Sequence, residues 1–461
     1  MINFDRKKIS GWAKSHYSIC DYIEITDENN IEEIFSYAKK NNKKISFRGG
    51  GRSYGDNILN KNNIVLKIIP KIKIFSFDNK KGKIEVSGSC TLIELLNYLI
   101  PKGWILNVSP ASQFISIAGA ISNNVHGKNC PAKGYFGDYV EEIEILTPDK
   151  GIIKCSNIEN AELYNAAISG LGCFGIILKA KIKLRKIKTA KINTQVFYVQ
   201  NIDSAVEKSQ ELIHNYEFNI GSLNFTRFNK KVTNGRIYSS NFSETEDLNI
   251  TKAKANLFIY AINLGLMSNN IPYVDKFIEY AFSKITSQRV YGKKEIKQDY
   301  CSMNFLGDKY LPLYNNLFKN GFIEYQVIFD KNYYLNAIHQ MENLLYKNGY
   351  SSYMSSFKLY KPSSEKYMLG LNKDGFCLTL DIPVSKNDNF ELFTRKLNEI
   401  TIKHNGQVYL GKTPCINNEE FKEMYKNYNK FKSIKENYDS NFLIVSEMTA
   451  RIFSDIYNYK Y

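Results

Sequence analysis

A run of three glycines lies in the segment RGGGRSYGD at residues 48–56. Consecutive glycines leave backbone N–H groups free to converge on an anion, because no side chain blocks its approach. Ser53 and Tyr54 add hydroxyl donors, and Arg48 or Arg52 adds positive charge. The segment therefore suits a diphosphate. It matches neither the GxGxxG dinucleotide fingerprint nor the GxxxxGK[ST] phosphate loop, and a glycine-rich hairpin turn is the simpler alternative.

Two further segments combine small residues with residues that can do chemistry. HGKN at 126–129 follows the small-residue stretch ISIAGAISNNV at 115–125. A histidine beside glycine and lysine can lie near a cofactor ring or a substrate phosphate, whereas a lone histidine is more often structural. Residues 170–175 contain three glycines, which suit either another close backbone approach or simple packing. Three such segments in one domain-sized stretch favour a large ligand contacted at several points, and FAD fits better than a mononucleotide.

The elements that must position these segments alternate between helix and strand. Apolar residues recur at helical spacing from residue 31 onward, and Thr91 is a plausible N-cap for a second helix. Alternating apolar residues predict strands, one of which runs directly into the glycines. The predicted helices are 31–42, 91–100 and 161–169, and the predicted strands are 45–47, 63–68, 83–87, 139–147 and the segment that follows 170–175.

The pattern changes after about residue 190, where strands rich in β-branched and aromatic residues alternate with helices. Residues 243–255 are polar and predict a loop, and QVYLGK near 406 predicts a last strand before helices to the end. The predicted domains are 1–190, 191–405 and a returning segment 406–461. The predicted strands are 193–199, 218–228, 234–242, 322–329, 354–360 and 376–382, and the predicted helices are 203–216, 271–285 and 332–347.

The net charge of +16 comes from single lysines spread along the chain, without a block of five or six basic residues. A nucleic-acid partner is therefore not expected. A solvated basic surface or contact with an anionic membrane face accounts for the charge. The eight cysteines form no CxxC pair and the five histidines no HExxH motif, so no metal site is expected.

Several features bear on where the protein works. Single separated cysteines suit a reducing compartment, and the N-terminal MINFDRKKISGW lacks the apolar stretch of a signal peptide. The longest apolar run, near 257–267, is far short of the ~20 residues needed to span a bilayer. The sequence predicts a cytoplasmic protein, with peripheral contact at the inner membrane as an option.

The glycine-rich segments resemble the FAD-binding domain of the vanillyl-alcohol oxidase family, also called the PCMH type. The resemblance rests on RGGGRSYGD, ISIAGAISNNVHGKN, GYFGDYV and LGCFGII, and it continues through GFIEYQV, SFKLY, GFCLTLDIP and QVYLGK. It extends along the chain outside residues 245–310. It implies an α+β fold of two domains: an FAD domain made of two α/β subdomains from both chain ends, and a central antiparallel sheet covered by helices.

The resemblance also implies site residues. Lys412 falls on a lysine near the flavin and the reacting hydroxyl, and Lys128 on a lysine near flavin and substrate. Substrate positions are Gln326, Lys358, Tyr360 and Cys377. Cys377 replaces a usual Asn, and Thr379 stands where some relatives carry a cysteine. The implied cofactor contacts are Arg48, Gly49, Gly50, Gly51, Arg52, Ser53, Tyr54, Gly55, Asp56, Asn57, Ser112, Ser116, Ile117, Ala118, Gly119, Asn123, Asn124, Val125, His126, Gly172, Gly175, Ile176 and Tyr409.

Many family members link FAD covalently to a histidine of the glycine-rich loop. Ser53 takes that position here, so non-covalent FAD is expected. The implied activity is oxidation of a secondary sugar hydroxyl, the 2′-hydroxyl of a polyprenyl-phosphate ribose, as the first half of an epimerisation to arabinose. A short-chain reductase would then be a partner. An aldonolactone or alditol oxidase that uses O2, and a non-catalytic flavin-binding protein of glycan assembly, stay open as alternatives.

Overall fold

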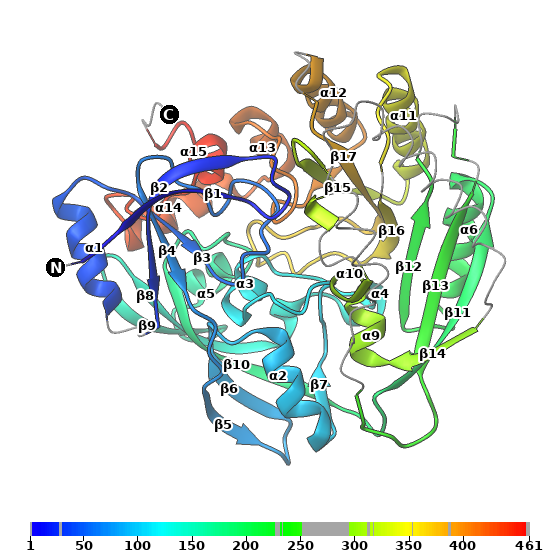
Figure 1. The fold of residues 1–461 in the computed structure, drawn as a ribbon, viewed down its shortest axis with the longest axis horizontal. Helices are drawn as coiled ribbons and strands as arrows, with labels where there is room; N and C mark the ends of the chain where they lie inside the picture. Colours follow the sequence, from blue (N-terminus) through cyan, green and yellow to red (C-terminus); the bar gives the residue numbers. More distant parts are fainter. Residues whose placement is uncertain are drawn as a thin grey trace.

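The computed structural model describes residues 2–457 apart from 27–29, 226–230, 233, 251–294, 311–313, 317, 353 and 386–388. Strands of the described residues form three sheets, of four, six and eight strands, and helices pack against each (Figure 1). The mixture of mainly antiparallel sheets and separate helices is an α+β fold, as predicted.

The smallest sheet has the order β1-β2-β4-β3 and delivers the chain to the glycine run. Parallel pairs join β2 to β4 and β4 to β3, while β1 and β2 are antiparallel. Helix α1 (Ile31–Lys40) buries its apolar face on this sheet, and β3 ends at the residue before the glycines. The strands are β1 (Asp5–Ser10), β2 (Tyr17–Ile25), β3 (Ile45–Arg48) and β4 (Ile64–Ile68).

The six-stranded sheet is antiparallel throughout and lies beside the first sheet. Its strands are β5 (Ile74–Asp78), β6 (Lys83–Ser87), β7 (Trp104–Leu106), β8 (Val140–Thr147), β9 (Gly151–Ser156) and β10 (Ile176–Lys186). Thr91 caps helix α2 (Leu92–Leu99) by accepting the Glu94 N–H, as the sequence indicates. The small-residue stretch contains the short helix α3 (Ile117–Ser122). The shorter elements are α4 (Cys130–Lys133), α5 (Ala161–Ala167), η2 (Ile100–Lys102) and η3 (Phe136–Tyr139).

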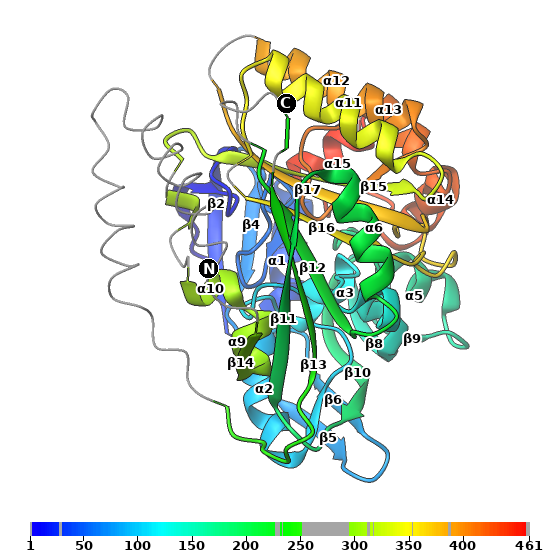
Figure 2. The same ribbon diagram turned by 90° about the vertical axis from the view of Figure 1, so that its right-hand side faces the viewer.

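The eight-stranded sheet is antiparallel, with the order β14-β11-β13-β12-β16-β17-β15-β18. Helices α6 (Ile202–Leu212), α11 (Tyr334–Lys347) and α12 (Asn389–Lys403) cover its outer face (Figure 2). The strands are β11 (Lys191–Val199), β12 (Phe218–Leu223), β13 (Gly235–Phe242), β14 (Glu295–Asp299), β15 (Phe322–Asp330), β16 (Ser355–Tyr360), β17 (Gly375–Pro383) and β18 (Gln407–Val408). The short elements near the inner face of this sheet are α9 (Tyr300–Asn304), α10 (Leu306–Tyr310) and η5 (Tyr314–Asn316).

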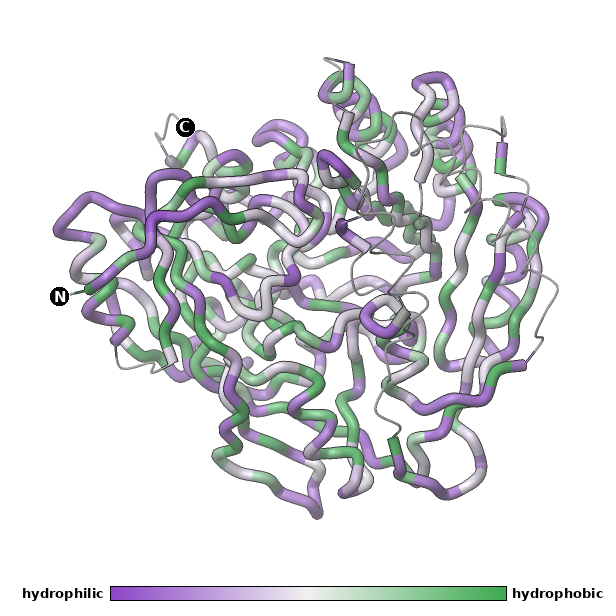
Figure 3. Tube along the Cα trace, viewed as in Figure 1, coloured by the Kyte–Doolittle hydropathy of each residue, from purple (hydrophilic) through white to green (hydrophobic). Residues whose placement is uncertain are grey.

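Strand β15 is buried on both faces. Strands of an antiparallel sheet commonly have one face exposed to solvent. Because side chains alternate along a strand, Tyr325 and Val327 enter the core beneath the helices. Glu324 and Gln326 point the other way, into a cavity. Figure 3 shows hydrophobic positions gathered along the inner strands and hydrophilic ones on the outer helix faces and turns.

The C-terminal residues return to the first sheet. Ile444 forms a parallel bridge with Ile45, whose N–H donates to the carbonyl of Leu443 at 2.8 Å. The C-terminal residues contain three helices: α13 (Asn418–Met424), α14 (Tyr428–Tyr438) and α15 (Glu447–Ile452). Figure 1 accordingly shows the orange and red end of the chain beside the blue N-terminal strands. Among the described helices, none is both long enough and apolar enough to cross a membrane.

Most predicted elements are confirmed, with shifted ends, and six strands were missed. QVYLGK was predicted as a strand, but only β18 at its start is one, and the rest turns away. Residues 243–250 lack helix and strand, as predicted. The helix predicted over 271–285 and the strand end at 226–228 lie outside the described residues, and the domain boundaries stay a prediction. The strands not foreseen are β1, β2, β5, β7, β9 and β14.

A buried ion pair fixes the returning segment. Lys435 of α14 and Asp439 are 1 % and 0 % exposed, with Nζ 2.5 Å from Oδ2. The same ammonium donates to the carbonyls of Cys173 and Ile444, and the carboxylate accepts the N–H groups of Leu443 and Ile444. The pair therefore holds two separate segments against each other.

Replacing Lys435 with Met should lower the free energy of unfolding by about 3 kcal/mol, because the substitution leaves a buried carboxylate without its counter-charge. Urea unfolding measures the change. Lys430→Met, at an exposed position of the same helix, is the matched control and should change stability by less than about 0.5 kcal/mol. Equal unfolding midpoints for the two variants would contradict the assigned role.

Candidate active site

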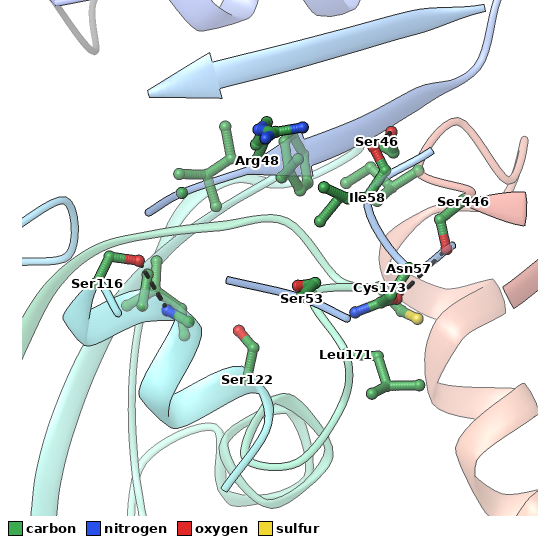
Figure 4. Close-up of a pocket in the computed structure, with 18 of the residues that line it drawn as sticks. Ser46, Arg48, Ser53, Asn57, Ile58, Ser116, Ser122, Leu171, Cys173 and Ser446 are labelled. Atoms are coloured by element: carbon green, nitrogen blue, oxygen red, sulfur yellow. Dashed lines mark hydrogen bonds between the residues drawn. The ribbon is translucent and has the colours of Figure 1, made fainter. Parts of the chain in front are cut away.

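A narrow cavity of about 110 Å³ lies where the first two sheets meet the C-terminal segment. The glycine loop, α3, the turn before β10 and the segment before α15 form its walls. Figure 4 shows Ser53 and Ser122 around its interior, with Asn57 and Ser446 joined by a hydrogen bond at one side. Among the described lining residues none is acidic, and Arg48 is the single cation. Such a lining suits an anionic ligand.

The glycines of the loop are required by close contacts. A Cβ on Gly50 would lie 1.8 Å from the carbonyl oxygen of Phe114, and one on Gly49 would lie 2.5 Å from Ser116 Oγ. Gly51 has a φ of +68°, which favours glycine. The loop therefore passes so near the segment that leads into α3 that only glycine fits, and its glycines line the two cavities.

A larger cavity of about 560 Å³ continues from the narrow one. The Oδ1 atom of Asn123, which lies in both walls, is buried without a hydrogen-bond partner in the protein. An elongated ligand with polar groups along its length would occupy both cavities. The residues that both linings share are Gly49, Ser53, Ile58, Ser116, Gly119 and Asn123.

A polar cluster around His126 forms part of the wall of the larger cavity. The Tyr360 hydroxyl lies 2.8 Å from His126 Nδ1, and the Gln326 amide nitrogen lies 3.0 Å from Nε2. Lys358 Nζ donates to the Gly127 carbonyl at 3.0 Å and lies 3.3 Å from Nδ1. The predicted residues Gln326, Lys358 and Tyr360 are therefore brought together, although they come from β15 and β16.

The imidazole of this cluster is neutral. Burial, with the charges of Lys358 and Lys412, holds the pKa of His126 well below its usual value. Burial likewise lowers the pKa of Lys358. His126 thus orients its neighbours and the ring edge of Tyr409, whose centroid is 5.0 Å away, and it carries no charge into the cavity.

Lys412 lies in the turn that follows β18. Its backbone N–H and that of Thr413 both donate to the Tyr409 carbonyl, and the Thr413 hydroxyl accepts from the N–H of Gln326 at 2.9 Å. The turn is thereby tied to β15. Lys412 Nζ lies 3.0 Å from Glu324 Oε1 and 3.5 Å from the centroid of the Tyr54 ring. An ammonium is therefore fixed in the cavity between a carboxylate and an aromatic face.

Lys128 lies deeper in the wall. Its Nζ donates to the carbonyls of Met303 at 3.0 Å and Asn304 at 2.5 Å. Burial, with the nearby charge of Lys358, lowers the pKa of Lys128 to about 7. The side chain therefore holds the end of α9 against the cavity, and its nearest partners are backbone carbonyls.

Most of the predicted site residues border one of the two cavities, and a few lie behind the wall. Tyr360 and Cys377 contact Gln326, which itself lines the larger cavity. Asp56 pairs with Arg451, and Asn124 donates to Ser363. The predicted residues outside both linings are Gly55, Asp56, Ile117, Asn124, Tyr360 and Cys377.

The sequence reasoning missed the C-terminal wall and three cavity carboxyl groups, those of Asp308, Glu324 and Asp381. Glu324 and Asp381 share a sheet face with Gln326 and Cys377, so alternation along the strands was a signal for both. Ser446 begins α15 and Ile444 precedes it in the apolar run LIV. A capping box after that run marked a helix start, but nothing local indicated contact with a ligand. Among the described residues, no three His, Cys, Asp or Glu side chains gather as metal ligands.

Comparisons with known proteins agree with this geometry. Residues 22–156 match a family model described as an FAD binding domain. This stretch contains the glycine loop, α3 and the HGKN segment.

Curated relatives extend the similarity. Decaprenylphosphoryl-beta-D-ribose oxidase of Mycolicibacterium smegmatis is 22% identical over 459 residues, which are 97% of each chain. L-gulonolactone oxidase of Bos taurus is 26% identical over 209 residues, 44% of this chain and 47% of the relative. D-arabinono-1,4-lactone oxidase of Debaryomyces hansenii is 28% identical over 200 residues, 40% of this chain and 35% of the relative.

Replacing Gly50 with Ala should weaken FAD binding by at least about 100-fold, since the added Cβ must displace the loop from the segment that leads into α3. The ratio of flavin to protein absorbance after purification and reconstitution measures the loss. Gly151→Ala is the matched control: it strains a φ of +66° in the β8–β9 turn but meets no atom within 4 Å. Normal flavin content in Gly50→Ala would contradict the role of the loop.

The described residues fit FAD. Glycine N–H groups and Arg48 suit its diphosphate, and the shared wall of the two cavities accommodates a ligand that reaches from one to the other. Residues 22–156 match the FAD-binding domain family, and the protein is an FAD-dependent oxidoreductase.

Proposed function

We propose that the protein oxidises a secondary hydroxyl of a sugar. One observation carries this proposal. The larger cavity, which continues from the narrow one, contains the ammonium of Lys412, and this ammonium is held against Glu324 and the ring of Tyr54. Loss of a hydroxyl proton builds negative charge on oxygen, and a fixed cation stabilises that charge. The three oxidases to which the chain is similar carry sugar or sugar-lactone names, which supports the same class.

Bound FAD would supply the hydride acceptor, and the protein supplies position and charge. The glycine loop and Asn123 would hold the cofactor. Lys412 orients the substrate hydroxyl and favours its deprotonated form. Gln326 and Lys358 present an amide and an ammonium to other sugar oxygens, because His126 and Tyr360 hold them in the wall.

The substrate that we propose is a polyprenyl-phosphate pentose, oxidised at the 2′-hydroxyl of ribose. The relative that spans 97% of the chain is a decaprenylphosphoryl-ribose oxidase by name. The larger cavity also continues along β12 and β13, where Asn224 and Arg236 lie in its wall. This extension offers room and positive charge for a substrate with a phosphate. A reductase acting on the keto product would complete an epimerisation to arabinose, and the basic surface would meet an anionic membrane face.

A second candidate is oxidation of a free aldonolactone or alditol, with O2 as electron acceptor. The 44% of the chain that aligns with L-gulonolactone oxidase supports it. The two candidates differ in the length of the substrate and in the release of peroxide.

Anaerobic mixing with a panel of substrates tests the function. Polyprenyl-phosphate ribose should bleach the flavin, whereas free lactones and alditols should not. Lys412→Met should keep its flavin and lose at least about 100-fold in the rate of bleaching, because the cation that favours the deprotonated hydroxyl is gone. Bleaching by lactones alone, with peroxide formed in air, would support the second candidate. If no sugar or lactone bleaches the flavin, sugar oxidation is refuted.

We also propose that FAD is bound without a covalent link. Ser53 stands where a linking histidine is found in many relatives, and both ring nitrogens of His126 are engaged by Tyr360, Gln326 and Lys358. Acid precipitation should therefore release all of the yellow colour into the supernatant. Flavin that stays with the precipitated chain would contradict the proposal.

A further inference from the structure

Two carboxyl groups face each other across the wall of the larger cavity. Glu324 of β15 and Asp381 of β17 are direct partners in the antiparallel register. They are 6 % and 5 % exposed, and both line the cavity. Directly opposite side chains of an antiparallel pair have Cβ atoms about 5 Å apart, a distance at which two buried negative charges repel strongly.

One cation serves both carboxyl groups. Lys412 Nζ lies 3.0 and 3.1 Å from the two oxygens of Glu324, so its contacts neutralise that carboxylate. Asp381 Oδ1 is buried and makes no hydrogen bond of normal geometry with the described residues, and the Tyr314 hydroxyl is the donor that faces this carboxyl group. An ionised Asp381 would therefore be a buried charge without a cation of its own, which is costly.

Among the described residues, the other titratable groups around the pair provide no further positive charge within hydrogen-bond reach. Tyr54 and Tyr314 are neutral, because burial raises the pKa of each phenol well above its usual value. Asp308 of α10 is itself acidic and accepts from the backbone N–H of Gln113. Lys358 of β16 donates to the Gly127 carbonyl. Burial and then the charge of Glu324 raise the pKa of Asp381 well above its usual value.

We propose that Glu324 and Asp381 hold one proton between them at neutral pH, and that Glu324 is the final acceptor of the proton that the substrate hydroxyl loses. This inference rests on the proposed sugar oxidation. A neutral Asp381 keeps a second negative charge away from the carboxylate of Glu324, which Lys412 contacts. Asp381 is thus a positioning residue.

The proton and electrons balance as follows. The hydroxyl O–H bond breaks, and its proton goes to Lys412 as Lys412 passes one of its own protons to Glu324. Bound FAD would accept the electron pair of the adjacent C–H bond as hydride, which leaves the carbon–oxygen double bond of the product. The carboxyl pair then holds two protons and Lys412 is again an ammonium.

Infrared spectra of the flavin-loaded protein test the shared proton without any substrate. The spectra are recorded from about pH 5 to about pH 9. At neutral pH the spectrum should contain the carbonyl band of one protonated buried carboxyl group. Asp381→Asn should remove that band. Glu342→Gln, which changes a buried carboxyl group of α11 away from the cavity, should leave it. Absence of the band from the wild-type spectrum overturns the proposal.

Thermal unfolding against pH gives an independent measure. A carboxyl group whose pKa is raised by folding binds its proton more tightly in the folded chain, so stability falls as pH rises from its ordinary pKa near 3.8 toward the raised value. Asp381→Asn escapes this loss. Its unfolding temperature relative to wild type should therefore rise by about 2 °C or more between pH 5 and pH 8. If the difference in unfolding temperature between Asp381→Asn and wild type stays constant over this pH range, the shared proton is refuted.

Activity then separates this inference from the proposed function. Glu324→Gln should retain FAD and lose at least about 100-fold in the rate of flavin bleaching by polyprenyl-phosphate ribose. A rate within about threefold of wild type would refute the acceptor role while sugar oxidation stands. If no sugar bleaches wild-type flavin, the proposed function and the acceptor role both fail, whereas the infrared and unfolding results still decide the shared proton.

Discussion

The contact between Arg451 and Asp56 is the interaction on which the site depends. Asp56 is buried at the end of the glycine loop, and its carboxylate binds the guanidinium of Arg451 in α15. The same guanidinium donates to the carbonyls of Pro414, at 2.5 Å, and Ile416, at 2.9 Å. One planar group with donors on several sides thus joins the glycine loop, the turn that carries Lys412 and the last helix. This contact therefore fixes the narrow cavity relative to the part of the larger cavity that contains Lys412.

The alternation of side chains along the strands explains how so many polar groups converge in the larger cavity around Lys412. Strands β15, β16 and β17 place most of their apolar residues toward the helices and most of their polar residues toward the cavity, and Ile328 and Cys377 are apolar exceptions on the cavity face. Adjacent strands are in register, so Glu324 meets Asp381 and Gln326 meets Thr379. The sheet is therefore apolar on one side and chemically active on the other, and the helices shield the apolar side. This arrangement lets side chains such as Lys358 be buried without disturbing the core.

The sequence predicted those elements whose apolar residues recur with a strong period. It also predicted the cavity-lining segments whose glycine-rich composition is unusual. Helix α1 and its buried face at Ile31, Ile34 and Phe35 follow from spacing alone, and the role of Thr91 follows from its type. The turn at Lys412 was predicted as a strand, because its conformation depends on hydrogen bonds to Tyr409 and β15 that spacing does not encode. Contacts between distant segments, such as Ile45 with Ile444, likewise leave no local pattern.

The groove for FAD is assembled from segments about 400 positions apart, since Gly49 and Ser446 both border it. A growing chain emerges from the ribosome at about 5–20 residues per second. The glycine loop is therefore exposed for tens of seconds before its opposing wall exists. During synthesis the loop has neither Arg451 nor Ile444 to hold it. Cofactor capture must accordingly follow translation, and a chain interrupted before α15 would stay colourless however well its first sheets had folded.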